Sequence, residues 1–208
     1  MWTQISSFLI ILTAIAAYGG LHSWLASLQS KALARQSLGS AADRFYRLAY
    51  NFVAVISFLP VLVLPAVLPD QTLYVIPFPW SLLSLLVQGL AVLALLVGVI
   101  QTGLWSFIGL EQLLESPKRT SSQLVVGGLY RWVRHPLYTA GLVFIWLTPV
   151  MTWNGLALII GLSLYLYIGA LFEERKLLRE FGEVYQNYQQ RTAMFFPGLN
   201  WRGLISRR

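Results

Sequence analysis

The chain alternates long apolar stretches with short segments that carry almost all of its charge. Four stretches contain no Asp, Glu, Lys or Arg: residues 1–30, 48–69, 71–110 and 137–172. A helix needs roughly 20 apolar residues to cross the hydrocarbon core of a bilayer. The pattern therefore predicts an all-α integral membrane protein with about five transmembrane helices.

Interruptions by proline, glycine and polar residues set the expected limits of the first three helices. We place these helices at about residues 5–28, 50–68 and 81–105. Pro60 and Pro65 fall inside the second helix, where a packed membrane helix tolerates proline because neighbouring groups satisfy the freed backbone. Residues 69–80 carry three prolines and are expected to form a short loop at the membrane interface.

The stretch 137–172 is too long for one span and tight for two. Pro149 and the pair Asn154–Gly155 interrupt it near its middle, which predicts a compact hairpin of a fourth and a fifth helix. Beyond Phe172, apolar residues at helical spacing predict an amphipathic C-terminal helix on the membrane surface or capping the bundle. Its apolar face is expected to hold Leu177, Phe181, Val184 and Tyr188.

The distribution of positive charge predicts how the helices are oriented. All fifteen Lys and Arg residues fall in the segments 31–47, 118–134 and 175–208, and the turns near Asp70 and Pro149 carry none. Five spans put the three basic segments on one side of the membrane, whereas four or six do not. Because basic loops remain in the cytoplasm, we expect an outside N-terminus, a cytoplasmic C-terminus and an active site at the cytoplasmic face.

Composition narrows the classes of function further. With 57% hydrophobic and 11% charged residues among 208, the chain is too apolar for a soluble domain. Its net charge of +7 then reflects orientation and contact with membrane lipids, and no nucleic-acid partner is expected. The chain has no cysteine and two histidines. We therefore expect no disulfide, no thiolate chemistry and no metal site.

Two groups of polar residues flank the predicted hairpin. Residues 127–138 lead into its first helix, and residues 173–176 follow its second. A hairpin brings its two ends together, so side chains from both groups are expected to line one pocket: Arg134, His135, Tyr138, Glu173 and Glu174. Taken singly, the arginine anchors a helix, the aromatic residue favours an interface and the glutamates begin a solvated helix. Their joint occurrence favours a functional site.

The ordered combination of these residues resembles the isoprenylcysteine carboxyl methyltransferase superfamily, which includes the phospholipid methyltransferases. The resemblance covers about residues 124–198 and rests on Gly128-Leu129-Tyr130, Arg134-His135-Pro136-Leu137-Tyr138, Glu173-Glu174-Arg175, Phe181-Gly182, Tyr185, Tyr188 and Phe196-Pro197.

Two further resemblances extend this one along the chain. The N-terminal half is similar to the NnrU-like branch through Leu21-His22-Ser23, Leu25-Ala26-Ser27 and Arg44–Leu48. Membrane enzymes of the methanethiol S-methyltransferase type look closest, through Phe107, Gly109-Leu110, Gln112, Thr148-Pro149 and Met151-Thr152. We therefore divide the chain into an NnrU-like part, residues 1–110, with the first three helices, and a methyltransferase-like part, residues 111–208.

The resemblance implies an enzyme that uses S-adenosylmethionine, held at the cytoplasmic side by the C-terminal half. His135 and Tyr138 would help to hold the nucleoside, and Glu173 and Glu174 the ribose or the methionyl amine. The other cofactor-binding positions that it implies are Gln112, Gly128, Tyr130, Arg134 and Pro136. The Gly-x-Gly motif that phospholipid methyltransferases carry in an earlier helix is missing, because Gly98 and Gly103 are too far apart.

The residue types also limit the methyl acceptor. A lipophilic or small thiol fits a membrane enzyme best, and its proton would have to pass to a base such as Glu111, Glu115 or His22. Arg134 can grip a methionyl carboxylate through a two-pronged fork. We therefore expect Arg134, Glu111 and His22 to be catalytic. His22 also has a simpler interpretation, slightly favoured, as a histidine hydrogen-bonded to a neighbouring helix.

Other functions stay open at this point. A haem-containing NnrU-like isomerase of the ζ-carotene isomerase type would use His22 and His135 as axial ligands, but leaves Glu173 and Glu174 without a role. A prenylcysteine carboxyl or phospholipid methyltransferase would differ in its acceptor. A scaffold or transporter subunit is disfavoured, because the spans hold no charged residue that would mark an ion or substrate path. The sequence leaves the oligomeric state open.

Overall fold

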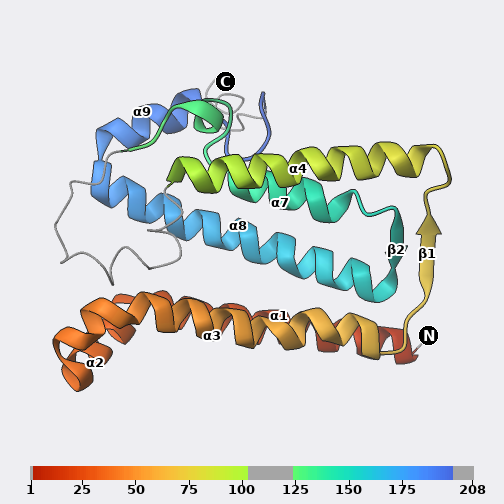
Figure 1. Ribbon diagram of the computed structural model, residues 1–208, viewed down its shortest axis with the longest axis horizontal. Coiled ribbons are helices and arrows are strands. Elements are labelled where there is room, and N and C mark those ends of the chain that lie inside the picture. The colour runs from red at the N-terminus through yellow and green to blue at the C-terminus, as the bar shows by residue number, and fades with distance from the viewer. Residues whose placement is uncertain (1, 103–123, 199–208) are drawn as a thin grey trace, which may run out of the picture. The chain divides into compact units, whose positions relative to one another are not determined.

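The computed structural model describes residues 2–102 and 124–198 (Figure 1). Its elements are α1 (Trp2–Ala26), α2 (Leu28–Leu38), α3 (Ser40–Val67), β1 (Thr72–Val75), α4 (Trp80–Thr102), the 3₁₀ turn η1 (Gly128–Arg131), α7 (Pro136–Trp146), β2 (Val150–Thr152), α8 (Trp153–Phe181) and α9 (Glu183–Arg191). Within this described part, α1, α3, α4 and α8 are long and apolar enough to cross a membrane. The predicted class, an all-α integral membrane protein, is confirmed.

The predicted hairpin consists of one short and one long helix. Helix α7 ends at Trp146 and α8 begins at Trp153, so the chain breaks where Pro149 and Asn154–Gly155 predict it. With 11 residues, α7 is roughly 16 Å long, about half the thickness of a bilayer core. The count of five spans therefore stays a prediction.

The C-terminal helix differs from its prediction. Glu173 and Glu174 lie inside α8, which continues to Phe181 because Glu, Arg, Lys and Leu all favour helix. The chain then breaks at Gly182, whose φ of 55° is in the left-handed region that favours glycine. The break changes the buried face of the following helix: Val184 is 65% exposed, and Tyr185 and Gln189 are buried instead.

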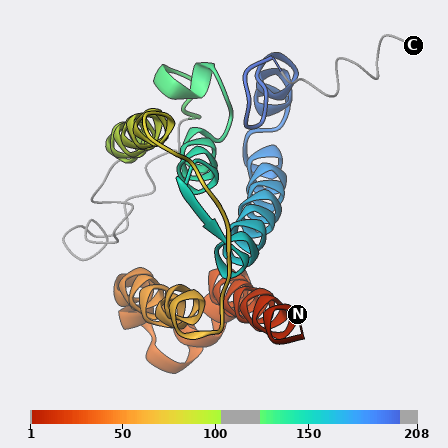
Figure 2. The ribbon, with the colours of Figure 1, turned by 90° about the vertical axis from the view of Figure 1, so that its right-hand side faces the viewer.

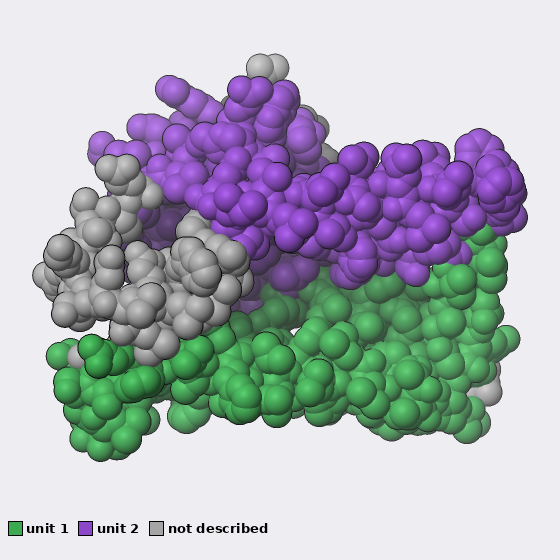
Figure 3. All heavy atoms as spheres, viewed as in Figure 1, with its two compact units in different colours: residues 1–76, 103–120, 150–165 green, residues 77–102, 121–149, 166–208 purple. Residues whose placement is uncertain are grey.

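The described residues divide into two compact units (Figure 3). Unit 1 holds residues 2–76 and 150–165, and unit 2 holds residues 77–102, 124–149 and 166–198. Helix α8 contributes to both units. These units differ from the division by resemblance at residue 110, because α4 joins the C-terminal unit and the beginning of α8 joins the N-terminal one.

Unit 1 is built on α1 and α3, which run antiparallel and side by side (Figures 1 and 2). Its core consists of buried side chains from α1, α3 and α8: Ile11, Ile15, Val61 and Ala157. Gly161 lets α8 approach α1 closely, since a methyl group added there would overlap the side chain of Ile15. Small residues serve this purpose where membrane helices meet.

A polar lock in unit 1 joins the end of α3 to the start of α8. Strands β1 and β2 pair antiparallel, which brings together the two turns that carry no Lys or Arg, as the five-span threading requires. The fully buried Asn154 donates from Nδ2 to the carbonyls of Pro65, Leu68 and Pro69 at 3.1–3.3 Å. Asp70 accepts the backbone N–H of Asn154 at 3.0 Å, so its negative charge lies at the N-terminus of α8.

Unit 2 is built on α4 and α7, which lie side by side (Figure 2). Gln88 of α4 donates to the carbonyl of Phe144 at 2.8 Å. Towards the other end of the pair, Gly98 leaves room for Leu137, because a Cβ at this glycine would lie 2.6 Å from a leucine methyl carbon. These contacts set the start of α7 and the residues that precede it.

The substitution Asn154→Ala tests the lock. Removing the amide leaves three partly buried carbonyls without this donor, which costs about 1–3 kcal/mol of unfolding free energy. We expect denaturant unfolding in detergent micelles to show this loss, and Asn187→Ala, at an exposed helix position, to change stability by less than about 0.5 kcal/mol. Equal effects of the two substitutions would contradict the assignment.

Candidate functional site

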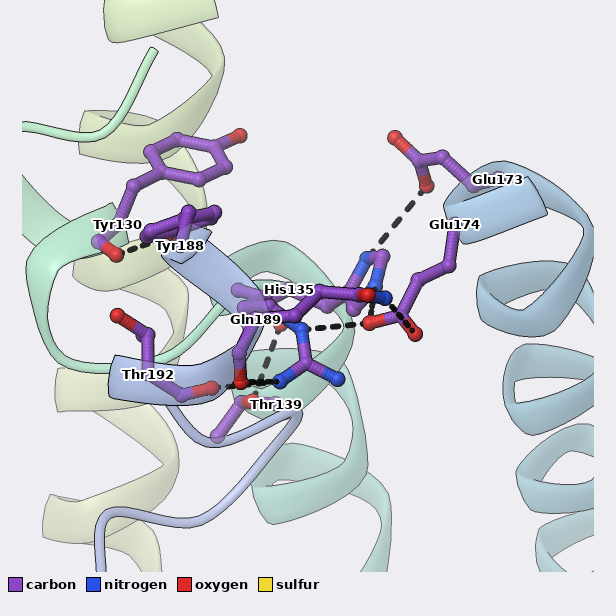
Figure 4. Close-up of polar contacts among 9 residues, drawn as sticks. Tyr130, His135, Thr139, Glu173, Glu174, Tyr188, Gln189 and Thr192 are labelled. Carbon is purple, nitrogen blue, oxygen red and sulfur yellow. Dashed lines mark hydrogen bonds and ion pairs between the residues drawn. The ribbon is translucent and has the colours of Figure 1, made fainter. Parts of the chain in front are cut away.

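The structure brings the two predicted polar groups together in unit 2. Arg134 and His135 precede α7, and Glu173 and Glu174 lie on α8 (Figure 4). The Arg134 Nε atom lies 2.6 Å from Glu174 Oε1, and His135 lies within ion-pair distance of both carboxylates. We call these four residues the ionic cluster. Their side chains come from positions about 40 residues apart in the sequence, as the hairpin argument predicts.

The backbone before α7 is shaped for this placement. Gly128 begins the 3₁₀ turn with a φ of 60°, which favours glycine, and a Cβ there would lie 2.5 Å from the Gln101 side chain, which would have to move. Pro136 occupies the first turn of α7, where its missing N–H is no loss. The residues between these two points therefore have a fixed path into the helix.

A C-terminal segment holds the same residues from the other side. The backbone N–H groups of Arg134 and His135 donate to the carbonyls of Ala193 and Met194 at 2.8 and 3.1 Å. Thr139 donates from its hydroxyl to the carbonyl of Phe195 at 2.8 Å. The chain after α9 thus fixes the position of the ionic cluster, although it lies some 60 residues away in sequence.

Glu174 is the buried member of the carboxylate pair. Its Oε1 accepts from Arg134 Nε and lies 3.3 Å from His135 Nε2, and its Oε2 accepts from Gln189 Nε2 at 2.9 Å. A buried carboxylate is stable only when donors satisfy both oxygens, and here they do. Glu174 therefore joins α8 to the start of α7 and to α9.

Glu173 has a different environment from its neighbour. Its side chain is 47% exposed, against 12% for Glu174, and its Oε2 lies 3.6 Å from His135 Nδ1. A half-exposed carboxylate that interacts with the imidazole and with Tyr138 still presents lone pairs to a ligand. Of the two predicted glutamates, Glu173 is thus the one that can accept hydrogen bonds from outside the cluster.

His135 lies between the two carboxylates. Burial disfavours its charged form, but the hydrogen bonds that its ring donates to Glu173 and Glu174, together with their negative charge, outweigh burial, so the pKa of His135 is above its ordinary value of 6.5. Its ring stacks on Tyr138, with centroids 5.4 Å apart and planes 5° from parallel. The imidazole is therefore fixed in orientation as well as biased towards the charged form.

The Arg134 side chain binds groups of the protein itself. Besides Glu174, it binds the carbonyls of Thr192 and Gln189 through Nη1 at 2.5 and 3.2 Å. Its guanidinium thereby neutralises the buried carboxylate and closes the end of α9. The sequence predicts that Arg134 binds a methionyl carboxylate. This geometry favours a different role, in which Arg134 positions Glu174.

Helix α9 supplies residues that sequence reasoning does not predict for the site. Gln189 contacts Glu174 directly, and Tyr188 donates a hydrogen bond to the carbonyl of Tyr130. Burial raises the pKa of Tyr188 to about 12, so the hydroxyl remains a donor at physiological pH. Tyr185 is 1% exposed, and its hydroxyl has no hydrogen-bond partner among the described residues. Tyr185 and Gln189 are four residues apart, so the sequence places them on one face of the helix. The face that the sequence predicts to be buried is a different one, which holds Val184.

His22 lies in unit 1 and has partners of its own. Its Nδ1 lies 2.8 Å from the Tyr165 hydroxyl and its Nε2 2.5 Å from the Tyr50 hydroxyl. These tyrosines belong to α8 and α3, so the slightly favoured interpretation, a histidine hydrogen-bonded to neighbouring helices, matches the structure. The expected residues Glu111 and Gln112, with the alternative base Glu115, lie outside the described residues.

Comparison with known proteins places the four residues of the ionic cluster within a matched region. Residues 84–184 match the family model described as phospholipid methyltransferase. The chain is 47% identical over 72 residues to the methanethiol S-methyltransferase of Pseudomonas sp. (strain GM41(2012)), covering 35% of this chain and 28% of that protein. It is 42% identical over 69 residues to the methanethiol S-methyltransferase of Mycobacterium tuberculosis (strain ATCC 25618 / H37Rv), covering 33% and 28%.

These matches confirm the resemblance predicted from the sequence, to the phospholipid methyltransferase superfamily and to methanethiol S-methyltransferases. The matched segments span about a quarter of the length of these relatives. No solved structure matches the chain. The NnrU-like character of residues 1–110 stays a prediction.

The raised pKa of His135 predicts how stability depends on pH. A group whose pKa is higher in the folded state stabilises the fold fully below its unfolded pKa, near 6.5, and loses this effect as pH rises through the folded value. We expect the unfolding temperature in detergent to fall as pH rises through this window. The substitution His135→Gln should flatten the profile, and an unchanged slope in that variant would contradict the assignment.

Proposed function

Because residues 84–184 match the phospholipid methyltransferase family, we propose that this chain is an integral membrane methyltransferase that uses S-adenosylmethionine and methylates a thiol. The relatives named methanethiol S-methyltransferase support the thiol as acceptor. The active site is the ionic cluster with the side chains around it, and it lies at the cytoplasmic face. The cytoplasmic position rests on the distribution of Lys and Arg.

The observation that carries the proposal is the ionic cluster itself. Only 11% of the residues are charged, yet three of them gather with His135 inside the matched region. Replacing a buried ion pair with apolar residues is often neutral or stabilising, so stability alone gives little reason to keep one. Clustered, perturbed titratable groups are frequent at functional sites.

The residues present fit the proposed cofactor. A half-exposed carboxylate such as Glu173 can accept two hydrogen bonds from a ribose diol or pair with an α-ammonium group. The buried hydroxyl of Tyr185, which has no partner among the described residues, can donate to a ligand, and burial, together with the charge of Glu174, raises the pKa of this tyrosine. The rings of Tyr130 and Tyr138 offer aromatic faces, which attract a cationic sulfonium.

When bound, S-adenosylmethionine supplies a methyl group that a thiol sulfur can attack. The chain's own contribution is to hold the reactants in line and to keep water away, because alignment accounts for much of the barrier that enzymes remove. Glu173 holds the cofactor, whereas Arg134 and His135 keep the carboxylates in place. The thiol proton needs a base, for which the sequence offers Glu111 as a candidate.

The geometry of the histidines counts against the haem-containing alternative. An axial ligand needs a ring nitrogen free to bind iron. Both ring nitrogens of His22 contact tyrosine hydroxyls, and both nitrogens of His135 face carboxylates. Haem ligation would require each histidine to give up one of these contacts.

Titration of the purified protein with S-adenosylhomocysteine tests the proposal. We expect Glu173→Ala to weaken binding by about tenfold or more, since a lost charge-assisted hydrogen bond costs about 1.5–3 kcal/mol and 1.4 kcal/mol is tenfold. The matched control is Glu183→Ala, at an exposed position on α9 outside the cluster. Folded protein that does not bind would refute the proposed cofactor, and binding that both substitutions leave unchanged would refute the role of Glu173 in holding it.

A labelled-methyl assay against thiols, prenylcysteines and phospholipids then tests the acceptor. Turnover on thiols is the expected result. Turnover confined to prenylcysteines or phospholipids would overturn the thiol assignment and leave the cofactor assignment standing.

A further inference from the structure

An apolar cavity of about 340 Å³, open at the surface of unit 2, lies between α4 and α7. Its lining includes residues of both helices and of the segment just before α7, and it contains no charged side chain. This volume is within the range of pockets that hold drug-sized ligands. The cavity is therefore far larger than a molecule of two heavy atoms, such as methanethiol, needs.

The sequence produces this space through small residues at facing positions. On α4 the lining residues recur at the spacing of one helix face, and Ala91 and Ala94 belong to that face. On α7 the lining residues have the same spacing and include Ala140. Alanine at these three positions leaves room that leucine or phenylalanine would fill.

The cavity shares a wall with the ionic cluster. Val133 and Pro136 line the cavity, whereas Arg134 and His135, the two residues between them, contact the carboxylates. Thr139 also lines the cavity, but its hydroxyl donates to backbone carbonyls. A molecule in the cavity would therefore lie in an apolar environment, against residues that are next in sequence to those of the proposed cofactor site.

We propose that this cavity binds the hydrocarbon part of an aliphatic thiol larger than methanethiol, so that the thiol is the acceptor and the chain length sets specificity. The inference rests on the proposed function. In the reaction, a lone pair of the acceptor sulfur forms the new carbon–sulfur bond. The bond between the methyl group and the donor sulfonium breaks, its electron pair stays on the donor sulfur, and the thiol proton passes to a base. The products are a methyl thioether and the uncharged donor.

The test compares hexanethiol with methanethiol as acceptors in the wild-type protein and in two variants. We expect wild-type kcat/KM to be at least tenfold higher for hexanethiol. Ala140→Leu and Ala94→Leu, which fill the cavity from opposite helices, should each lower this ratio by at least tenfold. The longer thiol partitions into detergent to the same extent in every sample, so comparing the hexanethiol-to-methanethiol ratio of a variant with that of the wild type removes this effect. Leu93→Phe, an exposed position on the same helix as Ala94, should leave the ratio unchanged.

Binding of S-adenosylhomocysteine separates failure of this inference from failure of the proposed function. Variants that bind it like the wild type, with a lowered hexanethiol ratio, support the cavity as the acceptor site. A ratio that neither alanine variant changes, in protein that still methylates methanethiol, overturns the inference and assigns the cavity to bound lipid only. Because the two variants fill the cavity from different helices, the failure of one to fold leaves the other as the test.

Discussion

A carboxylate buried near the end of an apolar helix is stable only if hydrogen-bond donors surround it, and Glu174 has three such donors from two other parts of the chain. Arg134 and His135 come from the start of α7, and Gln189 comes from α9. The same arginine then closes the end of α9 through two backbone carbonyls. One buried negative charge thus fixes three segments of unit 2 relative to one another. The orientation of His135 and the exposure of Glu173 both follow from that arrangement.

The sequence predicts the part of this site that depends on topology. Runs without charge define the helices, and a break near Pro149 implies that residues near 134 and 174 meet, as they do. It does not distinguish Glu173 from Glu174, since both are neighbours on one helix and only three-dimensional contacts bury one of them. The contribution of α9 is missed for a related reason. Helical periodicity extended through Gly182 assigns the buried face to Val184, whereas the positive φ of that glycine shifts burial to Tyr185 and Gln189.

The hydrophobic pattern of the sequence also leaves undetermined the lengths of the hairpin helices and the hydrogen bonds between distant segments. Hydrophobicity gives the extent of the stretch 137–172 but not its division into a helix of 11 residues and one of 29. Asp70 stands out in the sequence as an isolated charge, and its role depends on a partner 84 residues away. Pairs of this kind join segments that no local propensity connects. By contrast, the small residues Gly161, Ala91 and Ala140 are visible in the sequence, but their use becomes clear only when the facing helix is known.

The lock at Asn154 also has a consequence for the order of events during biosynthesis. Three carbonyls at and just beyond the end of α3 receive their donor from a residue 85 to 89 positions later, so a growing chain inserts α3 well before that donor exists. Until α8 arrives, those carbonyls depend on water at the membrane surface. Unit 1 therefore closes late, and a translation product that stops before β2 keeps the end of α3 open to quality-control proteases.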